Sequence, residues 1–387
     1  MKKHVKLRHK FYFWALRPVG IVFNLMFGFR CKPIKFKKGE HYLILSNHQT
    51  VLDPAFLCMQ FKAPLYIMAS DTLFNTSIAS RLLQYCFAPI KKKKATVDIN
   101  CIKTCAGVAK DGGNIAIFPE GNRSWTDTQM YIDPSICKLI RLLKLPVILY
   151  NLKGGFGVNP RWGGKRRKGK FYGEINSTLS VEKIKDLSDD ELYDTICKAL
   201  SVKDTQNGFE YLSKKPAECL ERVFFYCPKC KKLHTLTSLG DKIYCSACDF
   251  SATYNKDLTL SGAEDFGVSS LEDWYKLQIE VIKNLKVEEN KTVFIDNNVR
   301  LFDKTTARRT LISKGQLVMT DKAIMVGEQT INLNDITSAS LIGGVKLIIN
   351  TANNSYFLIG HERFNAIKYI LSFNVLSTTF KDDYYGL

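Results

Sequence analysis

Residues 42–53 read YLILSNHQTVLD, an apolar run followed directly by polar and ionisable side chains. The apolar part, 42–45, predicts a buried strand, and Pro54 suits the first turn of a helix that begins just beyond it. His48 therefore follows a strand end, and a turn of helix brings Asp53 back under its imidazole. A carboxylate bound to one ring nitrogen fixes the tautomer and leaves the other nitrogen free as a base. The stretch predicts a His–Asp pair that activates a hydroxyl group directly.

A second stretch of this kind lies at residues 115–124, IAIFPEGNRS. It is again an apolar run that ends in a polar turn. Gly121 permits a tight turn and a close approach of backbone, and Arg123 offers a planar fork that binds phosphate in a bidentate manner. This stretch predicts a phosphate site after a second buried strand.

Together the two stretches resemble the motifs of the glycerolipid acyltransferase family, the 1-acylglycerol-3-phosphate acyltransferases, and the resemblance covers roughly residues 10–215. The family's first motif, Asn-His-(four residues)-Asp, matches Asn47, His48 and Asp53. Its third, Phe-Pro-Glu-Gly-Thr-Arg-Ser, matches residues 118–124, with Asn122 in place of the threonine. The two motifs occur in order, each after an apolar strand, which makes the pair far more specific than either motif alone.

The resemblance implies a membrane-associated enzyme that moves a fatty acyl group from a thioester to the free hydroxyl of a lysophospholipid. The implied acceptor is 1-acyl-glycerol-3-phosphate, giving phosphatidate, with glycerol 3-phosphate or another lysolipid as alternatives. Acyl-CoA and acyl carrier protein (acyl-ACP) both present a thioester, and no residue chooses between them. The expected catalytic residues are His48 and Asp53. The expected substrate-binding residues are Asn47, Lys91, Lys92, Glu120, Gly121, Asn122, Arg123 and Ser124.

Two of these expectations need comment. The family's second motif usually supplies an arginine, and here Lys91 or Lys92 has to take its place, as a point charge without the planar fork. A solvated or membrane-facing lysine run is the alternative for these two residues. For Glu120 the resemblance implies a place in the phosphate and glycerol site, for example in orienting Arg123.

The chain beyond the first motif alternates strand-like and helical patterns, which predicts an α/β acyltransferase domain over 31–215, with a mixed sheet and flanking helices. Near its end, residues 161–170, RWGGKRRKGK, are strongly basic. They predict either a cover over the phosphate site or membrane contact. A flexible, solvated hairpin is the alternative.

Four cysteines define the next module, 220–256. Cys227 and Cys230 form one Cys-x-x-Cys pair, and Cys245 and Cys248 form a second. Two such pairs complete a tetrahedral four-thiolate site, so the sequence predicts a zinc ribbon with a closed, structural Zn²⁺. A redox-active pair of dithiols is the alternative. A helical linker is expected over 257–289.

The last part, 290–387, has short apolar strands divided by Gly, Asn and Asp turns, and then a helix. This β-rich domain closed by one helix resembles the pleckstrin-homology-like group, which implies binding of lipid headgroups or protein partners.

Charge and the first 30 residues point to a membrane. The 387 residues carry 56 Lys and Arg against 37 Asp and Glu, a net charge of +19, which favours polyanions. Residues 11–29 are rich in aromatic and aliphatic side chains, but Arg17, Pro18 and Asn24 interrupt them. We expect a helix lying in the plane of an anionic membrane surface, with a true span or a buried helix as alternatives.

Nucleic acid is the other polyanion to consider. The ribbon's lysines lack the stacking aromatic residues of a nucleic-acid surface, which argues against the alternative of a non-catalytic, basic zinc-ribbon binding protein. The twelve cysteines come without a signal peptide and cleavage site, which favours free thiols in a reducing compartment. The expected location is therefore peripheral or monotopic, on the cytoplasmic face of a bacterial membrane.

Overall fold

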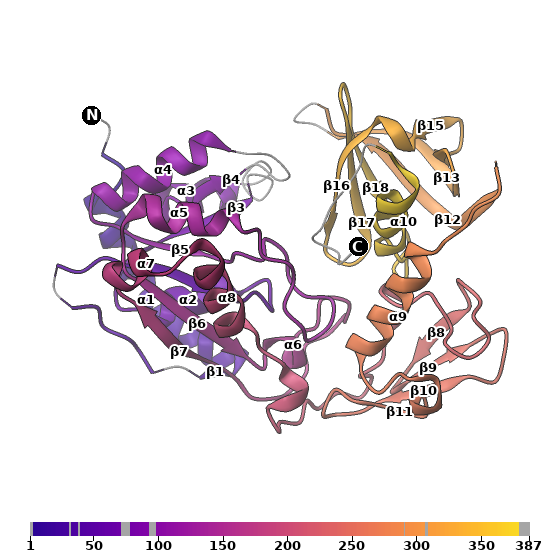
Figure 1. Ribbon diagram of the computed structural model, residues 1–387, viewed down its shortest axis with the longest axis horizontal. Helices are drawn as coiled ribbons and strands as arrows, with labels where there is room; N and C mark the ends of the chain where they lie inside the picture. The colour runs from indigo at the N-terminus through magenta and orange to yellow at the C-terminus, as the bar shows by residue number, and fades with distance from the viewer. Residues whose placement is uncertain are drawn as a thin grey trace. The chain divides into compact units, whose positions relative to one another are not determined.

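The computed structural model describes residues 3–30, 32–37, 39–70, 78–92, 98–289, 291–305 and 309–378. It divides into two compact units. Unit 1 comprises Met1–Val158 and Gly169–Phe209, and unit 2 comprises Asn159–Lys168 and Glu210–Leu387. Figure 1 colours unit 1 from indigo to magenta and most of unit 2 from rose to yellow.

Unit 1 is built on a seven-stranded sheet with the order β1-β7-β6-β2-β5-β3-β4. Neighbouring strands are parallel throughout, except for the antiparallel pair β6 and β7. The central strands are apolar and buried on both faces, as is typical of a sheet covered by helices on two sides. The predicted mixed sheet with flanking helices is confirmed.

The strands of unit 1 are β1 (Phe29–Arg30), β2 (Leu43–Ser46), β3 (Leu65–Ser70), β4 (Ile90–Lys92), β5 (Asn114–Ile117), β6 (Val147–Lys153) and β7 (Phe171–Leu179). Its helices are α1 (Leu7–Phe27), α2 (Asp53–Gln60), α3 (Ile78–Phe87), α4 (Ile99–Lys110), α5 (Ser135–Leu143), α6 (Gly155–Val158), α7 (Val181–Asp186) and α8 (Asp189–Leu200), with the 3₁₀ turn η2 (Asp204–Gln206).

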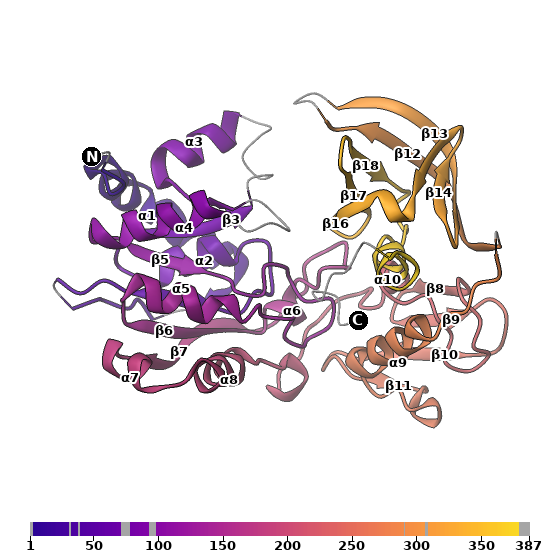
Figure 2. The ribbon, with the colours of Figure 1, turned by 45° about the horizontal axis from the view of Figure 1, so that its top comes forward.

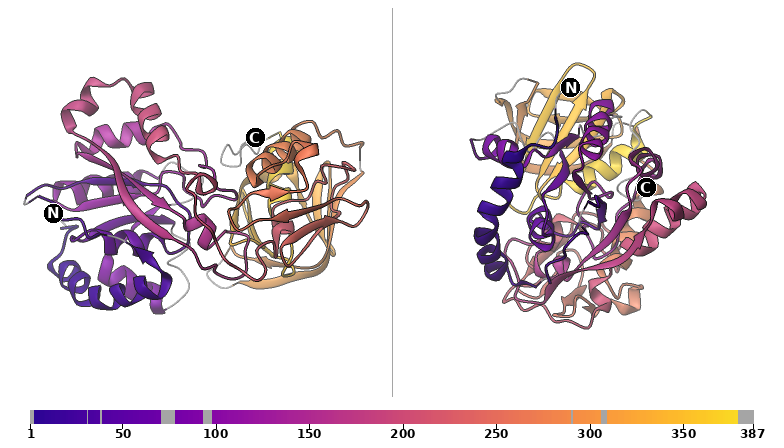
Figure 3. Two further views of the ribbon diagram at one scale, coloured as in Figure 1. Left: turned by 90° about the horizontal axis from the view of Figure 1, so that it is seen from below. Right: turned by 90° about the vertical axis from the view of Figure 1, so that its left-hand side faces the viewer.

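Helices cover both faces of this sheet (Figure 3). Because side chains alternate along a strand, β2 sends Leu43 and Leu45 into one core, where they meet Cys105 of α4, Ile140 of α5 and Ile196 of α8. Helices α1 and α2 belong to the opposite side. The capping box of Ser188 and Glu191 starts α8, as its first-turn acids suggest.

Helix α1 is a single long helix of 21 residues that ends at Gly28, a left-handed cap residue. Within the part of the chain that the structure describes, no helix is long and apolar enough to cross a membrane. Many apolar side chains of α1 are exposed, so it is not the buried helix considered as one alternative.

Unit 2 contains two antiparallel sheets (Figure 2). The four-stranded sheet has the order β11-β10-β9-β8, and its strands are β8 (Leu236–Leu239), β9 (Lys242–Cys245), β10 (Ser251–Tyr254) and β11 (Leu260–Ser261). The seven-stranded sheet has the order β15-β14-β13-β12-β18-β17-β16. Its strands are β12 (Thr292–Asp303), β13 (Thr310–Thr320), β14 (Ala323–Val326), β15 (Gln329–Asn332), β16 (Ile336–Ile342), β17 (Lys346–Thr351) and β18 (Ser355–Ile359).

Helices α9 (Leu271–Lys283) and α10 (Ile367–Leu376), with the 3₁₀ turns η3 (Leu220–Arg222), η4 (Glu264–Phe266) and η5 (Leu333–Asp335), complete unit 2. The predicted β-rich C-terminal domain closed by one helix is confirmed, and its sheet is antiparallel. Gly240, with φ of +64°, lies in the turn that joins β8 to β9.

The basic stretch 161–170 differs at three positions from the membrane contact and from the solvated hairpin considered above. Trp162 is fully buried, and Arg161 and Arg167 are also buried. The Arg167 guanidinium lies 5.0 Å from the ring centroids of both Trp162 and Tyr254, and it donates a hydrogen bond to the Pro216 carbonyl. Two cation–π contacts and one backbone acceptor stabilise this charge inside unit 2, so Arg167 is part neither of a solvated hairpin nor of a membrane contact.

Candidate functional site

The candidate active site lies where β2 and β5 end. These strands are adjacent and parallel, with Leu43, Ile44 and Leu45 opposite Ile115, Ala116 and Ile117. Their carboxyl ends therefore meet at one edge of the sheet, which is where open α/β sheets usually place their ligands. The two sequence stretches singled out above are brought together at this edge.

The predicted His–Asp pair is formed. The Nδ1 atom of His48 lies 2.8 Å from Oδ2 of Asp53, and Asp53 is the first residue of α2. Oδ2 also accepts the backbone N–H groups of Gln49 and Thr50, while Oδ1 accepts the Thr50 hydroxyl. The carboxylate is fully buried, and these four donors replace its hydration.

This arrangement sets the chemistry of His48. A carboxylate can only accept hydrogen bonds, so Nδ1 carries the proton and Nε2 is left as the basic nitrogen. The ring stacks on Phe118 with centroids 4.6 Å apart, and its side chain is 19% exposed. An oriented imidazole with a free basic nitrogen can take a proton from a bound hydroxyl.

Glu120, in the loop after β5, connects this loop to the loop after β2 through hydrogen bonds. Its Oε1 accepts the backbone N–H of His48 at 2.9 Å, and its Oε2 accepts the N–H of Met130 at 2.8 Å. The Ser124 N–H in turn lies 3.4 Å from the His48 carbonyl oxygen. Burial raises the pKa of the Glu120 carboxyl to about 8, although both backbone hydrogen bonds lower it. The role seen for Glu120 is thus to hold the backbone of His48.

Arg123 lies in the same loop and is half-buried. Burial lowers the pKa of its guanidinium, and the nearby charge of Asp53 raises it. Gly121, with φ of +63°, makes the tight turn expected of it, and Asn122 donates its N–H to the Glu120 carbonyl. Ser124 is buried, and its hydroxyl bonds the Thr126 carbonyl. The loop thus brings a cation close to the His–Asp pair.

A small cavity adjoins this pair. It is lined on one side by Asn47, His48, Gln49 and Glu120, and on the other by Ser124 and residues 126–129 with Phe156, Leu200 and Val202. Asn47 itself is tied to β6: its Nδ2 donates to the Leu152 carbonyl at 2.9 Å, and its Oδ1 accepts the Leu152 N–H at 2.7 Å. The amide of Asn47 therefore joins the first motif to the strand beside it.

Two residues of the site were not predicted from the sequence. Gln49 accepts the Gly155 N–H through Oε1 at 2.8 Å, and its side chain also bonds Asp204. Asp204 is buried and accepts the N–H groups of Gly154 and Gly157. A Cβ at Gly155 would come within 2.7 Å of the Gln49 oxygen, so this position needs glycine. Gln49 lies beside His48 in a polar stretch, but Asp204 gave no sequence signal.

Lys91 and Lys92 are exposed at the carboxyl end of β4, paired with Ala69 and Ser70 of β3. Strand β4 is the edge strand, separated from β5 by β3. Their strand ends at the same edge of the sheet as His48, but two strands beyond the loop of Arg123. At about 4.8 Å per strand, this is a separation of roughly 10 Å from β5.

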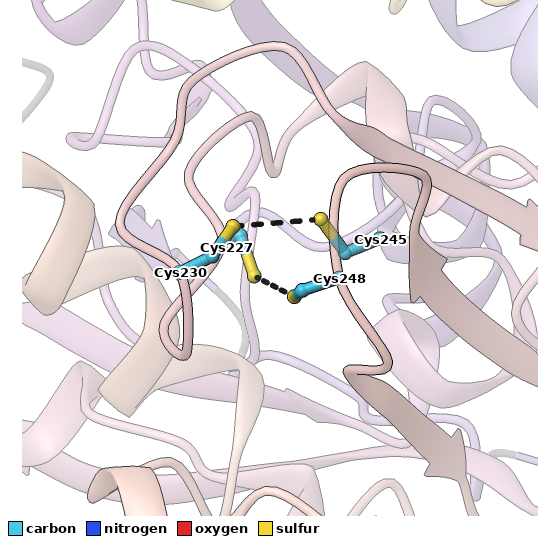
Figure 4. Close-up of side chains that lie close together, drawn as sticks. All are labelled: Cys227, Cys230, Cys245 and Cys248. Carbon is cyan, nitrogen blue, oxygen red and sulfur yellow. Dashed lines mark hydrogen bonds between the residues drawn. The ribbon is translucent and has the colours of Figure 1, made fainter.

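The four predicted metal ligands of unit 2 lie together (Figure 4). Their sulfur atoms are all within 4.8 Å of one another. Sγ of Cys227 is 3.8 Å from that of Cys248, and Sγ of Cys230 is 3.7 Å from that of Cys245. A tetrahedron with Zn–S bonds near 2.3 Å has edges of about 3.8 Å. The donor set fits a four-thiolate metal ion, and these separations are far too long for disulfides.

We predict that Glu120→Gln removes a pH dependence of stability. With its pKa raised from 4.5 to about 8, Glu120 keeps its proton in the folded chain after the unfolded chain has lost it. Its contribution to stability is then complete below pH 4.5 and is lost as the pH rises to 8, by up to about 1.4 kcal/mol per pH unit. Urea unfolding between pH 5 and 8 should show this fall in the unmodified protein and a flatter profile in the variant. Equal slopes would contradict the prediction.

We also predict that the purified protein holds one zinc ion per chain, measured by elemental analysis. Cys245→Ser should lose it and lower the unfolding temperature, because binding energy at such a site is folding energy. Cys58→Ser is the matched control, since Cys58 is a half-buried free thiol of unit 1. Full zinc content in Cys245→Ser would contradict the assignment.

Comparisons with known proteins bear on unit 1. The family model described as Acyltransferase matches residues 32–150. Among solved structures, the chain is similar to the 1-acyl-sn-glycerophosphate (LPA) acyltransferase PlsC from Thermotoga maritima, at 17% identity and a TM-score of 0.43, over 50% of this chain and 78% of that one. The comparison with curated proteins gave no match. Both motifs of the candidate site lie inside the matched range, and residues 32–150 are an acyltransferase-family domain.

Proposed function

We propose that this protein is a membrane-associated O-acyltransferase. It transfers a fatty acyl group from a thioester, acyl-CoA or acyl-ACP, to the free hydroxyl of a lysophospholipid. 1-Acyl-glycerol-3-phosphate is the preferred acceptor and phosphatidate the product. The observation that carries the proposal is the His48 imidazole, held by the buried Asp53 carboxylate at 2.8 Å beside the loop of Arg123.

The proposed reaction needs no covalent enzyme intermediate. Nε2 of His48 takes the proton of the acceptor hydroxyl as its oxygen attacks the thioester carbonyl carbon. The tetrahedral adduct then expels the thiolate, and the C–S bond breaks as the new C–O ester bond is kept. The proton on Nε2 passes to the leaving sulfur, so His48 returns to its neutral form. Asp53 holds the ring and stabilises the imidazolium while it carries both protons.

Arg123 is proposed to bind the acceptor's phosphate, with the turn at Gly121 and Asn122 allowing close approach. Fixing the phosphate positions the hydroxyl next to Nε2, which converts an encounter between molecules into an oriented one. Asn47, Glu120 and Ser124 are proposed to hold the backbone of this site, as their hydrogen bonds to Leu152, His48, Met130 and Thr126 suggest. Lys91 and Lys92 are proposed as a more distant positive charge.

Membrane association is supported by the two sides of α1. Its polar residues His9, Arg17 and Asn24 are buried. Arg17 donates to the carbonyls of Met59 and Phe61, both at 3.0 Å. Apart from Lys10, the outward side chains are largely apolar: Leu7, Phe11, Trp14, Val19, Ile21, Val22, Leu25 and Met26 are each more than half exposed. An apolar face turned outward suits a helix lying in the interface of a membrane, here proposed as the cytoplasmic face.

In unit 2 we propose that Zn²⁺ bound by the four cysteines is structural, because all four ligands come from the protein and no position is left open. The seven-stranded sheet with α10 is proposed as a pleckstrin-homology-like domain, on the order of its strands and the final helix.

We expect His48→Ala to lower acyl transfer to lysophosphatidate at least about 10²-fold, since a general base contributes this much or more. Three donors to Asp53 remain, so the fold should persist. The assay uses purified protein, mixed micelles and a long-chain acyl thioester, with circular dichroism as the control for folding. Unchanged acyl transfer by a folded His48→Ala variant would contradict the proposed mechanism.

Arg123→Ala should raise the KM for lysophosphatidate about 10- to 100-fold with a smaller effect on kcat, as expected for a lost charged hydrogen bond. Transfer to monoacylglycerol, which has no phosphate, should be equally slow in both proteins. Arg123→Lys, which keeps the charge without the fork, should fall between them. A KM unchanged by Arg123→Ala would place the phosphate elsewhere.

A further inference from the structure

A larger cavity lies at the opposite edge of the sheet in unit 1. Its volume is about 420 Å³, in the range of small-molecule sites. His41 comes just before β2, Pro64 just before β3, and Asn114 begins β5, and all three line it. These strands are parallel, so the cavity sits at their amino ends, whereas His48 follows the carboxyl end of β2. The sheet thus separates this cavity from the proposed acceptor site.

The lining of this cavity is basic. Lys10, Lys35, Lys37 and Lys62 all contribute to it, together with His41. Glu40 is the one acid in the lining, and it lies 3.9 Å from Lys37 and accepts the Tyr42 hydroxyl. Lys10, Lys35 and Lys62 form no ion pair with any residue that the structure describes. A hollow lined by one sign of charge focuses its field and attracts a counter-ion of the opposite sign.

Apolar walls accompany these charges. Trp14, Phe36 and Tyr66 line the cavity. Phe36 is held by stacking on Tyr42 and Phe61, with ring centroids 4.9 and 5.1 Å apart. Gly112 leaves room for the His41 ring, because a Cβ there would come within 2.8 Å of its Nε2. A cavity lined by both lysines and rigid aromatic side chains fits an anion that has an apolar part.

The cavity also adjoins the outward face of α1. Lys10 and Trp14 are four residues apart on this helix and so point to the same side. Next to them are the exposed apolar residues Leu7 and Phe11, which are 83% and 66% exposed. If α1 lies in a membrane interface, the mouth of the cavity is at the depth of the phosphates, where Trp and Lys residues are favoured.

We propose that this cavity binds the phosphate headgroup of an anionic phospholipid that is not the acyl acceptor. Lys35 and Lys62 provide the charge for the phosphate, Lys10 adds a third cation, and Trp14 and Phe36 contact the glycerol and upper chain carbons. The lipid stabilises α1 on anionic membranes and leaves the acceptor site free. This inference rests on the proposed membrane association of α1, but not on the proposed chemistry of His48.

The test is calorimetric titration of the full chain with dihexanoylphosphatidylglycerol below its critical micelle concentration, which measures binding without a membrane. Lys35→Gln/Lys62→Gln should weaken binding about tenfold or more, the cost of one lost charged hydrogen bond or two. The matched control is Lys103→Gln/Lys138→Gln, which removes the same charge from exposed lysines of α4 and α5. The control pair should bind as the unmodified protein does.

Each other outcome overturns the proposal. Equal weakening by both pairs would mean that diffuse charge attracts the lipid, and no binding by the unmodified protein would mean that there is no site. Inorganic phosphate bound as tightly as the lipid would assign the cavity to a soluble phosphate. His48→Ala and Arg123→Ala should bind the lipid normally, and a loss in either would place it in the acceptor site. A wrong proposal for the chemistry would appear instead as absent acyl transfer, on which this titration does not depend.

Discussion

Unit 1 depends on one buried charge at the start of α2. The Asp53 carboxylate has no exposure to solvent, and an unpaired carboxylate there would be too costly to keep. Four donors offset that cost, and all four come from residues 48–50. The same hydrogen bonds that make this burial possible therefore fold the turn after β2 and fix the orientation and tautomer of His48. Local stability and the preparation of a base arise from one interaction.

A second buried acid, Glu120 in the loop after β5, also helps to position His48. Glu120 binds the backbone of His48 rather than its ring, so it positions the histidine without adding a charge beside Nδ1. Its raised pKa has burial as the largest cause. The two acids thus differ in their tasks because their partners differ: Asp53 bonds the imidazole and backbone around it, and Glu120 joins two loops. Asn47 and Gln49 continue this pattern toward β6 and the turn after it.

The contacts that the sequence predicted correctly are mostly between residues that lie close together in the chain. His48 and Asp53 are five residues apart, so chain geometry alone nearly determines their contact, and the two Cys-x-x-Cys pairs were recognisable by their spacing. The α/β pattern predicted the sheet, and the family resemblance implied that residues 115–124 and 42–53 share one site. The partners of Asn47, Gln49 and Glu120 were beyond prediction, because Leu152, Gly155 and Met130 reach them only through the tertiary fold. For the stretch 161–170 the prediction was wrong in the other direction. Its charge indicated exposure to solvent or membrane, but Arg167 is buried against Trp162 and Tyr254 in unit 2.

The parallel sheet offers two edges, and their chemistry differs for a physical reason. At the carboxyl ends of β2 and β5, the loops hold the buried acids Asp53 and Glu120, and the backbone N–H groups of residues 48–50 solvate them. At the amino ends, the chain enters the sheet through residues 32–42, which contain four lysines and one acid, Glu40, and α1 adds Lys10. Because α1 turns His9 and Arg17 inward to Tyr66, Met59 and Phe61, Lys10 and the apolar residues are left facing out together. Such a surface is unfavourable in water alone, whereas an anionic interface provides both a counter-charge and an apolar phase. The fold therefore places the His48–Asp53 pair and the proposed lipid cavity at opposite edges of one sheet.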